Sequence, residues 1–308
     1  IALQMGMQGM AYMHSDLGGF AGDYYDNELY LRWLQYGVFN PIFRPHAQEE
    51  VASEVVYKEI DTKAIAKKAV ELRYQLLPYN YNLAFENSQT GKPFMRPLFF
   101  EEIHNKDLLS KSDGYLWGND FLIYPITEKG QTHQEVYFPK TSNWFDFYTG
   151  KKYNAGITKT IDLNKENIPT FVRGGSFIPM SKAVQNTNDY TFENLEIHYY
   201  YDENVKNNSQ KIYNDDGKTP NSFENGKYEN LIFESQIKDK NLVILITNNI
   251  GKNFVSKDKN LNLVIHNAKI KKVLLATKEI IFTQKNNQII IPLNLKKEIN
   301  LEIKIELE

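Results

Sequence analysis

Polar side chains follow two short apolar runs near the start of the chain. Asp16 and Phe20 stand on either side of two glycines after the first run, and Arg44 and His46 end the second. A carboxylate, an aromatic ring, an arginine and a histidine gathered at one place form a polar cup with one apolar wall. Proteins hold sugars and small polyols in this way. The four residues therefore predict a site for a neutral, hydroxyl-rich ligand.

Each of these residues also has a structural interpretation. Asp16 precedes a turn, where a carboxylate can accept hydrogen bonds from nearby backbone amides. His46 follows a proline, and a single histidine there favours a structural hydrogen bond over a ligand contact. It is the combination of residues at the ends of two adjacent strands that favours the binding site.

A helix between the two runs would place these residues together. Residues 28–36 have the apolar spacing of a helix. A strand, a helix and a second strand form a βαβ unit, whose two strands are parallel neighbours. In a parallel α/β barrel the ligand lies at the C-terminal ends of the strands. We therefore expect the first residues of the chain to form part of a binding site.

The first ten residues read as the tail of a helix closed by glycine. No capping residue precedes Ile1, and neither an initiator methionine nor a signal peptide is visible. One βαβ unit cannot cover both faces of its own strands. We expect this chain to be the C-terminal piece of a longer polypeptide. The sequence does not determine the cellular compartment, although a bacterial periplasmic or secreted location is favoured over the cytoplasm.

The composition excludes several classes of function. The chain has 308 residues, a net charge of −2 and no cysteine, and 13% of its residues are aromatic. Because a net charge this small provides no electrostatic field to hold a polyanion, no nucleic-acid partner is expected. No apolar run reaches the roughly 18 residues that suggest a membrane span. Disulfides and thiolate zinc sites are excluded, but the absence of cysteine does not settle the compartment.

A second helical stretch runs from residue 64 to residue 86. Asp61 or Thr62 is the expected N-cap, and Gly91 lies beyond the C-terminal end. Pro78 inside the stretch should kink or shorten the helix.

Beyond residue 91 the pattern changes to short apolar runs separated by turn residues. Such spacing predicts antiparallel sandwiches. We expect residues 1–91 to be the end of a (β/α)8 barrel with its last two strands and helices, residues 92–180 a proximal β-sandwich and residues 181–308 a distal one. The expected strands include residues 98–100, 121–126, 135–139, 144–148, 242–246, 263–265, 273–275, 288–291 and the strictly alternating stretch 299–307.

Three other groups contain residue types that occur in binding sites. The acidic pair Glu49 and Glu50 is typical of a solvent-exposed loop. The sequence Asp215–Asp216–Gly217 lacks the alternating oxygen ligands of a calcium loop and reads as a turn. His14 and His46 lack a third histidine or cysteine nearby, so no metal site is expected.

The chain resembles the C-terminal part of family 31 glycoside hydrolases, the α-glucosidase and α-xylosidase group. The similarity runs almost end to end, and its motifs stand in the family's order. They are Asp16–Leu17–Gly18–Gly19–Phe20, Arg32–Trp33–Leu34–Gln35, Arg44–Pro45–His46, the stretch from Leu72 to Tyr79, Arg96–Pro97–Leu98, Trp144–Phe145–Asp146–Phe147, residues 172–179, Asn214–Asp215–Asp216–Gly217 and Gly226–Lys227–Tyr228.

The resemblance implies a retaining enzyme with two catalytic aspartates about 5–5.5 Å apart. In the family both precede the motif at Asp16, so both are expected upstream of Ile1, and no catalytic residue is expected in this chain. The substrate-binding residues implied here are Asp16, Phe20, His46 and Arg44, with Arg44 bracing the strand ends rather than touching sugar. No cofactor and no metal are implied, because the chemistry needs only carboxylates and water.

Two classes of function follow. The first is an exo-acting α-glycoside hydrolase, foremost an α-glucosidase, whose partners are an α-linked oligosaccharide or glycoside and the upstream part of its own polypeptide. Within it, α-xylosidase, α-galactosidase, glucan lyase and transglycosylase stay open. The second is a non-catalytic carbohydrate-binding or structural protein with a vestigial barrel remnant.

Overall fold

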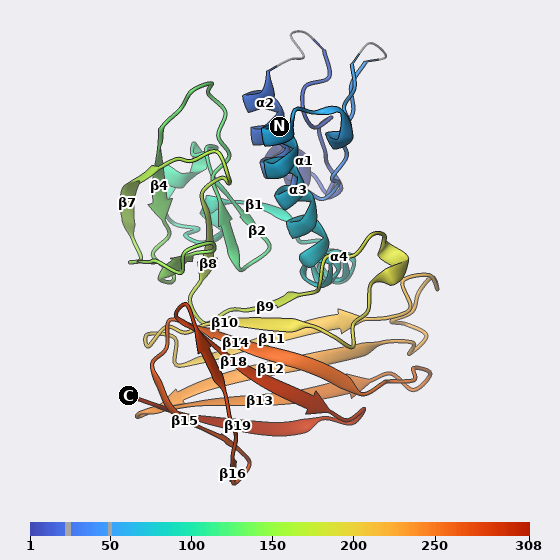
Figure 1. The fold of residues 1–308 in the computed structure, drawn as a ribbon, viewed down its shortest axis with the longest axis vertical. Coiled ribbons are helices and arrows are strands. Elements are labelled where there is room, and N and C mark those ends of the chain that lie inside the picture. The colour runs from blue at the N-terminus through green and yellow to red at the C-terminus, as the bar shows by residue number, and fades with distance from the viewer. Residues whose placement is uncertain (22–25, 49–50) are drawn as a thin grey trace. The chain divides into compact units, whose positions relative to one another are not determined.

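The computed structural model describes residues 1–21, 26–48 and 51–308. They divide into two compact units, which are described separately below (Figure 1). The first unit contains Ile1–Tyr74 and Glu86–Arg173, and the second contains Gln75–Phe85 and Gly174–Glu308.

The first unit begins with two helices, α1 (Ala2–Met7) and α2 (Asn27–Gly37). The Asp26 carboxylate caps α2 by accepting a 3.0 Å hydrogen bond from the amide of Leu29. The pKa of Asp26 is lowered, mainly by its hydrogen bond with Lys129 and then by the Leu29 amide. The predicted helix over 28–36 is therefore confirmed, with one further residue at each end.

The long helical stretch is divided into α3 (Ile60–Gln75) and α4 (Leu77–Thr90). The break lies at Leu76, two residues before Pro78, as expected from the missing amide hydrogen of proline. Gly91 follows α4 with φ of 72°, also as expected. The expected cap at Asp61 or Thr62 is wrong. The helix starts earlier, and the amide of Lys63 already donates to the carbonyl of Glu59 at 2.8 Å.

The remaining part of the first unit is antiparallel sheet. Its six-stranded sheet has the order β1-β2-β3-β8-β5-β6, and β4 pairs with β7 in a separate ribbon. The strands are β1 (Met95–Pro97), β2 (Tyr115–Trp117), β3 (Phe121–Ile123), β4 (His133–Phe138), β5 (Trp144–Asp146), β6 (Lys152–Tyr153), β7 (Ile157–Asp162) and β8 (Thr170–Arg173). A buried cluster that includes Leu122, Phe138 and Trp144 joins the sheet and the ribbon.

Residues 98–100 do not form the expected strand. They form a 3-10 helix, η2 (Leu98–Phe100), and β1 ends just before it. The last pair in the β1–β2 ladder is Pro97 with Tyr115. Proline has no amide hydrogen to continue a ladder, so the chain leaves the sheet at this point. The other 3-10 helices described are η1 (Val55–Tyr57), η3 (Lys106–Leu109) and η4 (Thr187–Asp189).

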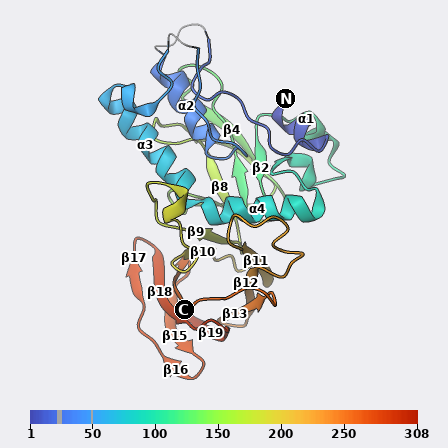
Figure 2. The same cartoon turned by 90° about the vertical axis from the view of Figure 1, so that its right-hand side faces the viewer.

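The second unit contains a five-stranded and a six-stranded sheet, drawn in yellow to red in Figures 1 and 2. Their strand orders are β17-β18-β14-β10-β9 and β11-β12-β13-β19-β15-β16. Among the described strand pairs of these two sheets, β10 and β14 are parallel and the others are antiparallel. The strands are β9 (Phe177–Met180), β10 (Glu196–Tyr200), β11 (Asn207–Asn214), β12 (Glu229–Lys238), β13 (Asn241–Ile250), β14 (Lys259–His266), β15 (Ile270–Leu275), β16 (Lys278–Glu279), β17 (Thr283–Lys285), β18 (Gln288–Leu295) and β19 (Asn300–Leu307).

One hydrophobic core is shared by these two sheets. It contains Leu263 and Ile291 from the first sheet and Phe233, Ile244 and Ile303 from the second. The alternation predicted for the last strand is confirmed, because the odd positions of β19 from 303 onward are buried while its even positions are exposed or half-buried. Within the described chain, no helix is long and apolar enough to cross a membrane.

The start of α4 belongs to the second unit through its aromatic side chains. The ring of Phe85 stacks on Tyr213 with centroids 3.7 Å apart. Tyr81 and Tyr213 both donate hydrogen bonds to Asp215, at 2.6 and 2.8 Å. The next carboxylate, Asp216, accepts from the amide of Thr219 at 2.7 Å. The sequence from Asp215 to Gly217 therefore forms the predicted turn.

Two histidines lie side by side between β10 and β14. Nδ1 of His198 is 2.9 Å from Nε2 of His266, and the His266 ring stacks on Tyr200 at 4.2 Å. Glu196, 3.6 Å from His198, is the carboxylate facing the pair. Burial, and then the charge of His198, lowers the pKa of His266 to about 3. This histidine is therefore held neutral in the folded protein.

We expect the second unit to lose stability as the pH falls below about 6.5. The unfolded chain takes up a proton on His266 there and the folded chain does not, which costs about 1 kcal/mol between pH 6 and pH 5. Hydrogen exchange of β14 peptides, corrected for intrinsic rates, measures this loss. His266→Gln should flatten the pH slope, and His104→Gln at an exposed position should not. An unchanged slope in His266→Gln would contradict the assignment.

Candidate functional site

The ends of the two runs that carry the expected site residues are adjacent and parallel. Leu17 and Pro45 form an isolated parallel bridge. The amide of Leu17 donates to the carbonyl of Arg44 at 3.1 Å, and the amide of His46 donates to the carbonyl of Leu17 at 3.4 Å. The two strands expected from the sequence are thus reduced to a single bridge, and polar residues flank it directly.

Helix α2 packs behind this bridge and fixes its position. Leu17 is fully buried with Tyr30, Leu31 and Leu34 of the helix. A Cβ atom on Gly18 would lie 2.5 Å from the ring of Tyr30, and the φ of Gly18 is 99°, so only glycine fits there. The first glycine after Asp16 is therefore required by close packing.

Tyr30 is held in its neutral form. Its hydroxyl donates a 2.9 Å hydrogen bond to the carbonyl of Ser53. Burial, followed by the charge of Glu54, raises the pKa of Tyr30 to about 12. The ammonium of Lys58 lies 4.2 Å from the centre of the same ring, and burial lowers its pKa. These contacts tie the segment after His46 to α2.

Asp16 lies between two basic side chains. Its Oδ1 atom is 3.5 Å from Nε2 of His14 and 3.5 Å from Nη2 of Arg44. The Asp16 side chain is 32% exposed, so its carboxylate is partly open to solvent. Both distances exceed those of direct hydrogen bonds, which leaves the oxygens able to accept from a ligand.

Phe20 and His46 form the second pair. Their ring centroids are 5.6 Å apart and the planes are tilted by 42°. Phe20 is 41% exposed, which is high for a phenylalanine. Within the described part of the chain, this ring contact is the only side-chain interaction recorded for His46. Its ring nitrogens therefore have hydrogen-bonding capacity left over.

His14 is a functional candidate that the sequence interpretation missed, because it was considered only as a metal ligand. It stands two residues before Asp16 in an extended segment, and residues at i and i+2 share one side of such a segment. That spacing was the available signal. The intervening Ser15 accepts a 2.9 Å hydrogen bond from the indole of Trp33 in α2. Nδ1 of His14 is buried and has no partner among the described residues.

The arrangement can accept and donate hydrogen bonds beside an exposed aromatic ring. No group of three or more histidine, aspartate or glutamate side chains that could hold a metal ion occurs in residues 1–21, 26–48 and 51–308. The acidic pair Glu49 and Glu50 lies outside the described residues. The hydrogen-bonding groups and the exposed ring together fit a neutral polyol.

Two family models match the chain. The model of the glycosyl hydrolases family 31 TIM-barrel domain matches residues 1–83. That of the glycosyl hydrolase family 31 C-terminal domain matches residues 91–178. The chain belongs to glycosyl hydrolase family 31.

Two relatives are about one-third identical to this chain over the aligned residues. Alpha-glucosidase 2 of Bacillus thermoamyloliquefaciens is 35% identical over 261 residues, which are 82% of this chain and 31% of the relative. An alpha-xylosidase of Saccharolobus solfataricus is 32% identical over 235 residues, covering 73% of this chain and 31% of the relative. The chain thus spans about a third of the length of these two proteins.

A solved structure has the same fold over nearly the whole chain. The family 31 dextranase of Flavobacterium johnsoniae, complexed with glucose, superposes with a TM-score of 0.91 at 26% identity. The match covers 99% of this chain and 41% of the dextranase.

Proposed function

We propose that this chain is the C-terminal portion of a retaining, exo-acting α-glycoside hydrolase, an α-glucosidase, and that it supplies residues that position the substrate. The observation that carries the proposal is the grouping of Asp16, Arg44, His46 and Phe20 beside one parallel bridge. Membership of family 31 supports the reaction class, and the α-glucosidase among the relatives supports the substrate.

We further propose the domain organisation that the family implies. Residues 1–91 would complete a (β/α)8 barrel, residues 92–180 would form the proximal β-sandwich and residues 181–308 the distal one. The parallel bridge at Leu17 supports the first assignment. The antiparallel sheets that follow residue 91 support the other two.

In this proposal each residue has a distinct part in substrate binding. His46 donates a hydrogen bond to a ring hydroxyl of the sugar in the cleavage subsite. Asp16 accepts from sugar hydroxyls or orients an arginine outside these residues, and Phe20 covers the apolar face of the ring. Arg44 braces the strand ends through its ion pair with Asp16. His14 adds a second positive partner for Asp16 when protonated.

The bond-breaking groups would lie in the part of the polypeptide that these 308 residues do not contain. Retaining enzymes use one carboxylate as nucleophile and one as general acid and base, about 5–5.5 Å apart. The chain covers 31% of the length of the alpha-glucosidase relative, which leaves room for both aspartates elsewhere. The residues described here would then bind the sugar as its ring flattens in the transition state.

The stereochemical outcome of hydrolysis tests this proposal. The full-length polypeptide should hydrolyse p-nitrophenyl α-D-glucopyranoside and release α-glucose first, because two successive inversions retain the configuration. Proton NMR of the first minutes of the reaction distinguishes the two anomers. Initial release of β-glucose, or no hydrolysis of α-glucosides, would contradict the proposal.

A further inference from the structure

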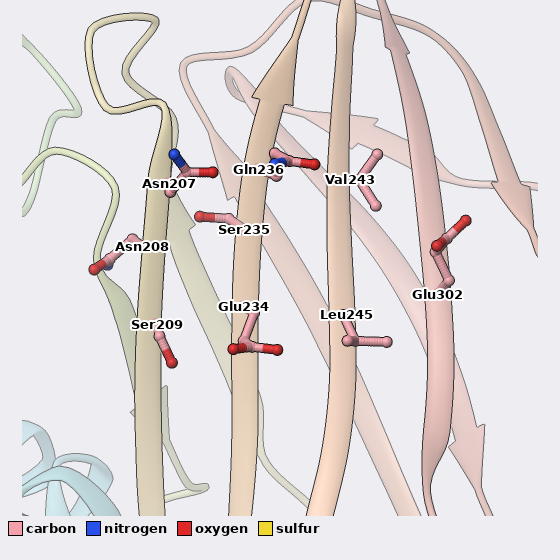
Figure 3. A pocket seen from close by; sticks show the side chains of 9 residues that line it. All are labelled: Asn207, Asn208, Ser209, Glu234, Ser235, Gln236, Val243, Leu245 and Glu302. Carbon is pink, nitrogen blue, oxygen red and sulfur yellow. The ribbon is translucent and has the colours of Figure 1, made fainter.

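A hollow of about 630 Å³ lies on the sheet formed by β11, β12, β13 and β19 (Figure 3). Its volume falls within the roughly 300–1,000 Å³ of typical small-molecule sites. We infer that this hollow binds an α-linked oligosaccharide. The choice of sugar rests on the proposed function, whereas the inference of a site for a neutral, hydroxyl-rich ligand rests on the hollow itself.

Strand register places seven of the nine lining residues in two rows across the sheet. The other two, Asn208 and Ser235, face each other between the rows, and the Asn208 side chain donates to the carbonyl of Gly175 at 2.7 Å. In the first row Asn207 faces Gln236, which faces Val243 on the next strand. In the second row Ser209 faces Glu234, Glu234 faces Leu245, and Leu245 faces Glu302.

These rows lie on the solvent side of the sheet. Side chains alternate between the two faces of a strand, and the residues between the rows, among them Ile244 and Ile303, are buried in the core. Figure 3 shows the labelled side chains of both rows on four successive strands. The hollow is therefore formed by strand pairing and not by one local segment.

The polar groups of the two rows are not used within the protein. In the part of the chain that the structure describes, no hydrogen bond or ion pair is recorded for the side chains of Asn207, Ser209, Glu234, Gln236 and Glu302. The turn carboxylate of Asp216 differs, since it accepts from the amides of Lys218 and Thr219. The hollow thus offers free donors and acceptors side by side.

The kinds of side chain indicate the ligand. Amide and hydroxyl groups both donate and accept, and carboxylates accept strong hydrogen bonds from hydroxyls. The lining contains two carboxylates and no lysine or arginine, and the cation next in register is Lys304, opposite Val243 at the end of the first row. The excess of carboxylates disfavours an anionic ligand. Glu234 and Glu302 stand on either side of Leu245, without a third carboxylate in the lining to complete a metal site. Val243 and Leu245 give an apolar floor that suits the C–H face of a sugar ring.

Affinity electrophoresis of the full-length polypeptide tests the inference. Native gels containing soluble dextran probe α-1,6 linkages, and gels containing amylopectin probe mainly α-1,4 linkages. The double variant E234A/Q236A should bind one of these polysaccharides about tenfold more weakly than the wild type, because two hydrogen-bonding side chains are lost. N207A/S209A should change binding in the same direction. The remaining sugar-binding residues are identical in all these proteins, so the difference reports on the hollow.

The control is K211A/T247A, which alters the same sheet face in the row beyond Ser209. It should migrate like the wild type. The inference is overturned if both hollow variants bind like the wild type, if the control weakens binding equally, or if neither polysaccharide retards the wild type. Hydrolysis of an aryl α-glucoside is measured on the same samples. If the protein does not hydrolyse the aryl α-glucoside but is still retarded in a way that depends on Glu234, the result would support binding at the hollow and contradict the proposed function.

Discussion

Replacing His46 by alanine in the full-length polypeptide should lower kcat/KM for an α-glucoside by about ten- to a hundredfold. A buried hydrogen bond to a charged group contributes roughly 1.5–3 kcal/mol. The ring of His46 packs beside Phe20 and has no other recorded side-chain interaction in the described chain, so its nitrogens are free to bind a ligand. Because sugar contacts tighten as the ring flattens, the loss should appear largely in the transition state.

Asp16→Asn should have an effect of similar size. The substitution keeps the shape of the side chain and removes the charge that His14 and Arg44 face at 3.5 Å. An amide also presents two donors where a carboxylate accepts. Steady-state kinetics on p-nitrophenyl α-D-glucopyranoside measures both variants, and circular dichroism verifies the fold.

His104→Ala is the matched control for His46→Ala. His104 is an exposed histidine of the first unit, close to η3, and should leave kcat/KM unchanged. If His46→Ala and Asp16→Asn both hydrolyse the substrate at the wild-type rate, these residues are structural and the pocket has been placed wrongly.

Lys259→Met should destabilise the second unit by about 3–5 kcal/mol, because it leaves a buried carboxylate without its cation. The Lys259 ammonium and the Glu229 carboxylate are 2.9 Å apart, and each side chain is 1% exposed. Ser256 and Asn248 each donate a 2.7 Å hydrogen bond to the same Glu229 oxygen. Removing the lysine disrupts this whole network.

The loss of stability in Lys259→Met should be measured in the second unit itself. All three tryptophans, Trp33, Trp117 and Trp144, lie in the first unit, so tryptophan fluorescence reports only on that unit. Hydrogen exchange of peptides from β12 and β14 gives the opening free energy of the strands that hold Glu229 and Lys259.

Lys296→Met is the matched control for this prediction. Lys296 also lies 2.9 Å from a carboxylate, that of Asp258, but its side chain is 85% exposed. Exposed ion pairs contribute little to stability, so this variant should exchange like the wild type. Equal protection in Lys259→Met and the wild type would show that the buried pair does not stabilise the unit.

Local patterns predicted the elements whose signals lie within a few residues. Helix α2 follows its apolar spacing, and the break before α4 follows from Pro78. The start of α3 was missed because Asp61 and Thr62 are favoured caps by residue type, whereas the backbone is already helical at Ile60. The strand expected over 98–100 failed because Pro97 ends its ladder.

Features that depend on pairing between distant residues were not predictable in this way. Glu229 and Lys259 are 30 positions apart, and no pattern near either residue indicates a buried ion pair. The polar stretch at Asn207 gives no strand signal of its own, yet it pairs with β12 and lines the hollow. At the candidate site, motifs pointed to Asp16, Phe20, Arg44 and His46, while the position of His14 beside Asp16 emerged from the structure.

The most direct test of the central proposal is the rate of hydrolysis of p-nitrophenyl α-D-glucopyranoside by the 308-residue chain and by the full-length polypeptide. We expect turnover from the full-length protein only, because the covalent intermediate needs a nucleophile that we propose to lie outside these 308 residues. Turnover by the 308-residue chain that is abolished by substituting one of its own carboxylates would contradict the proposal that it positions the substrate without carrying the catalytic aspartates.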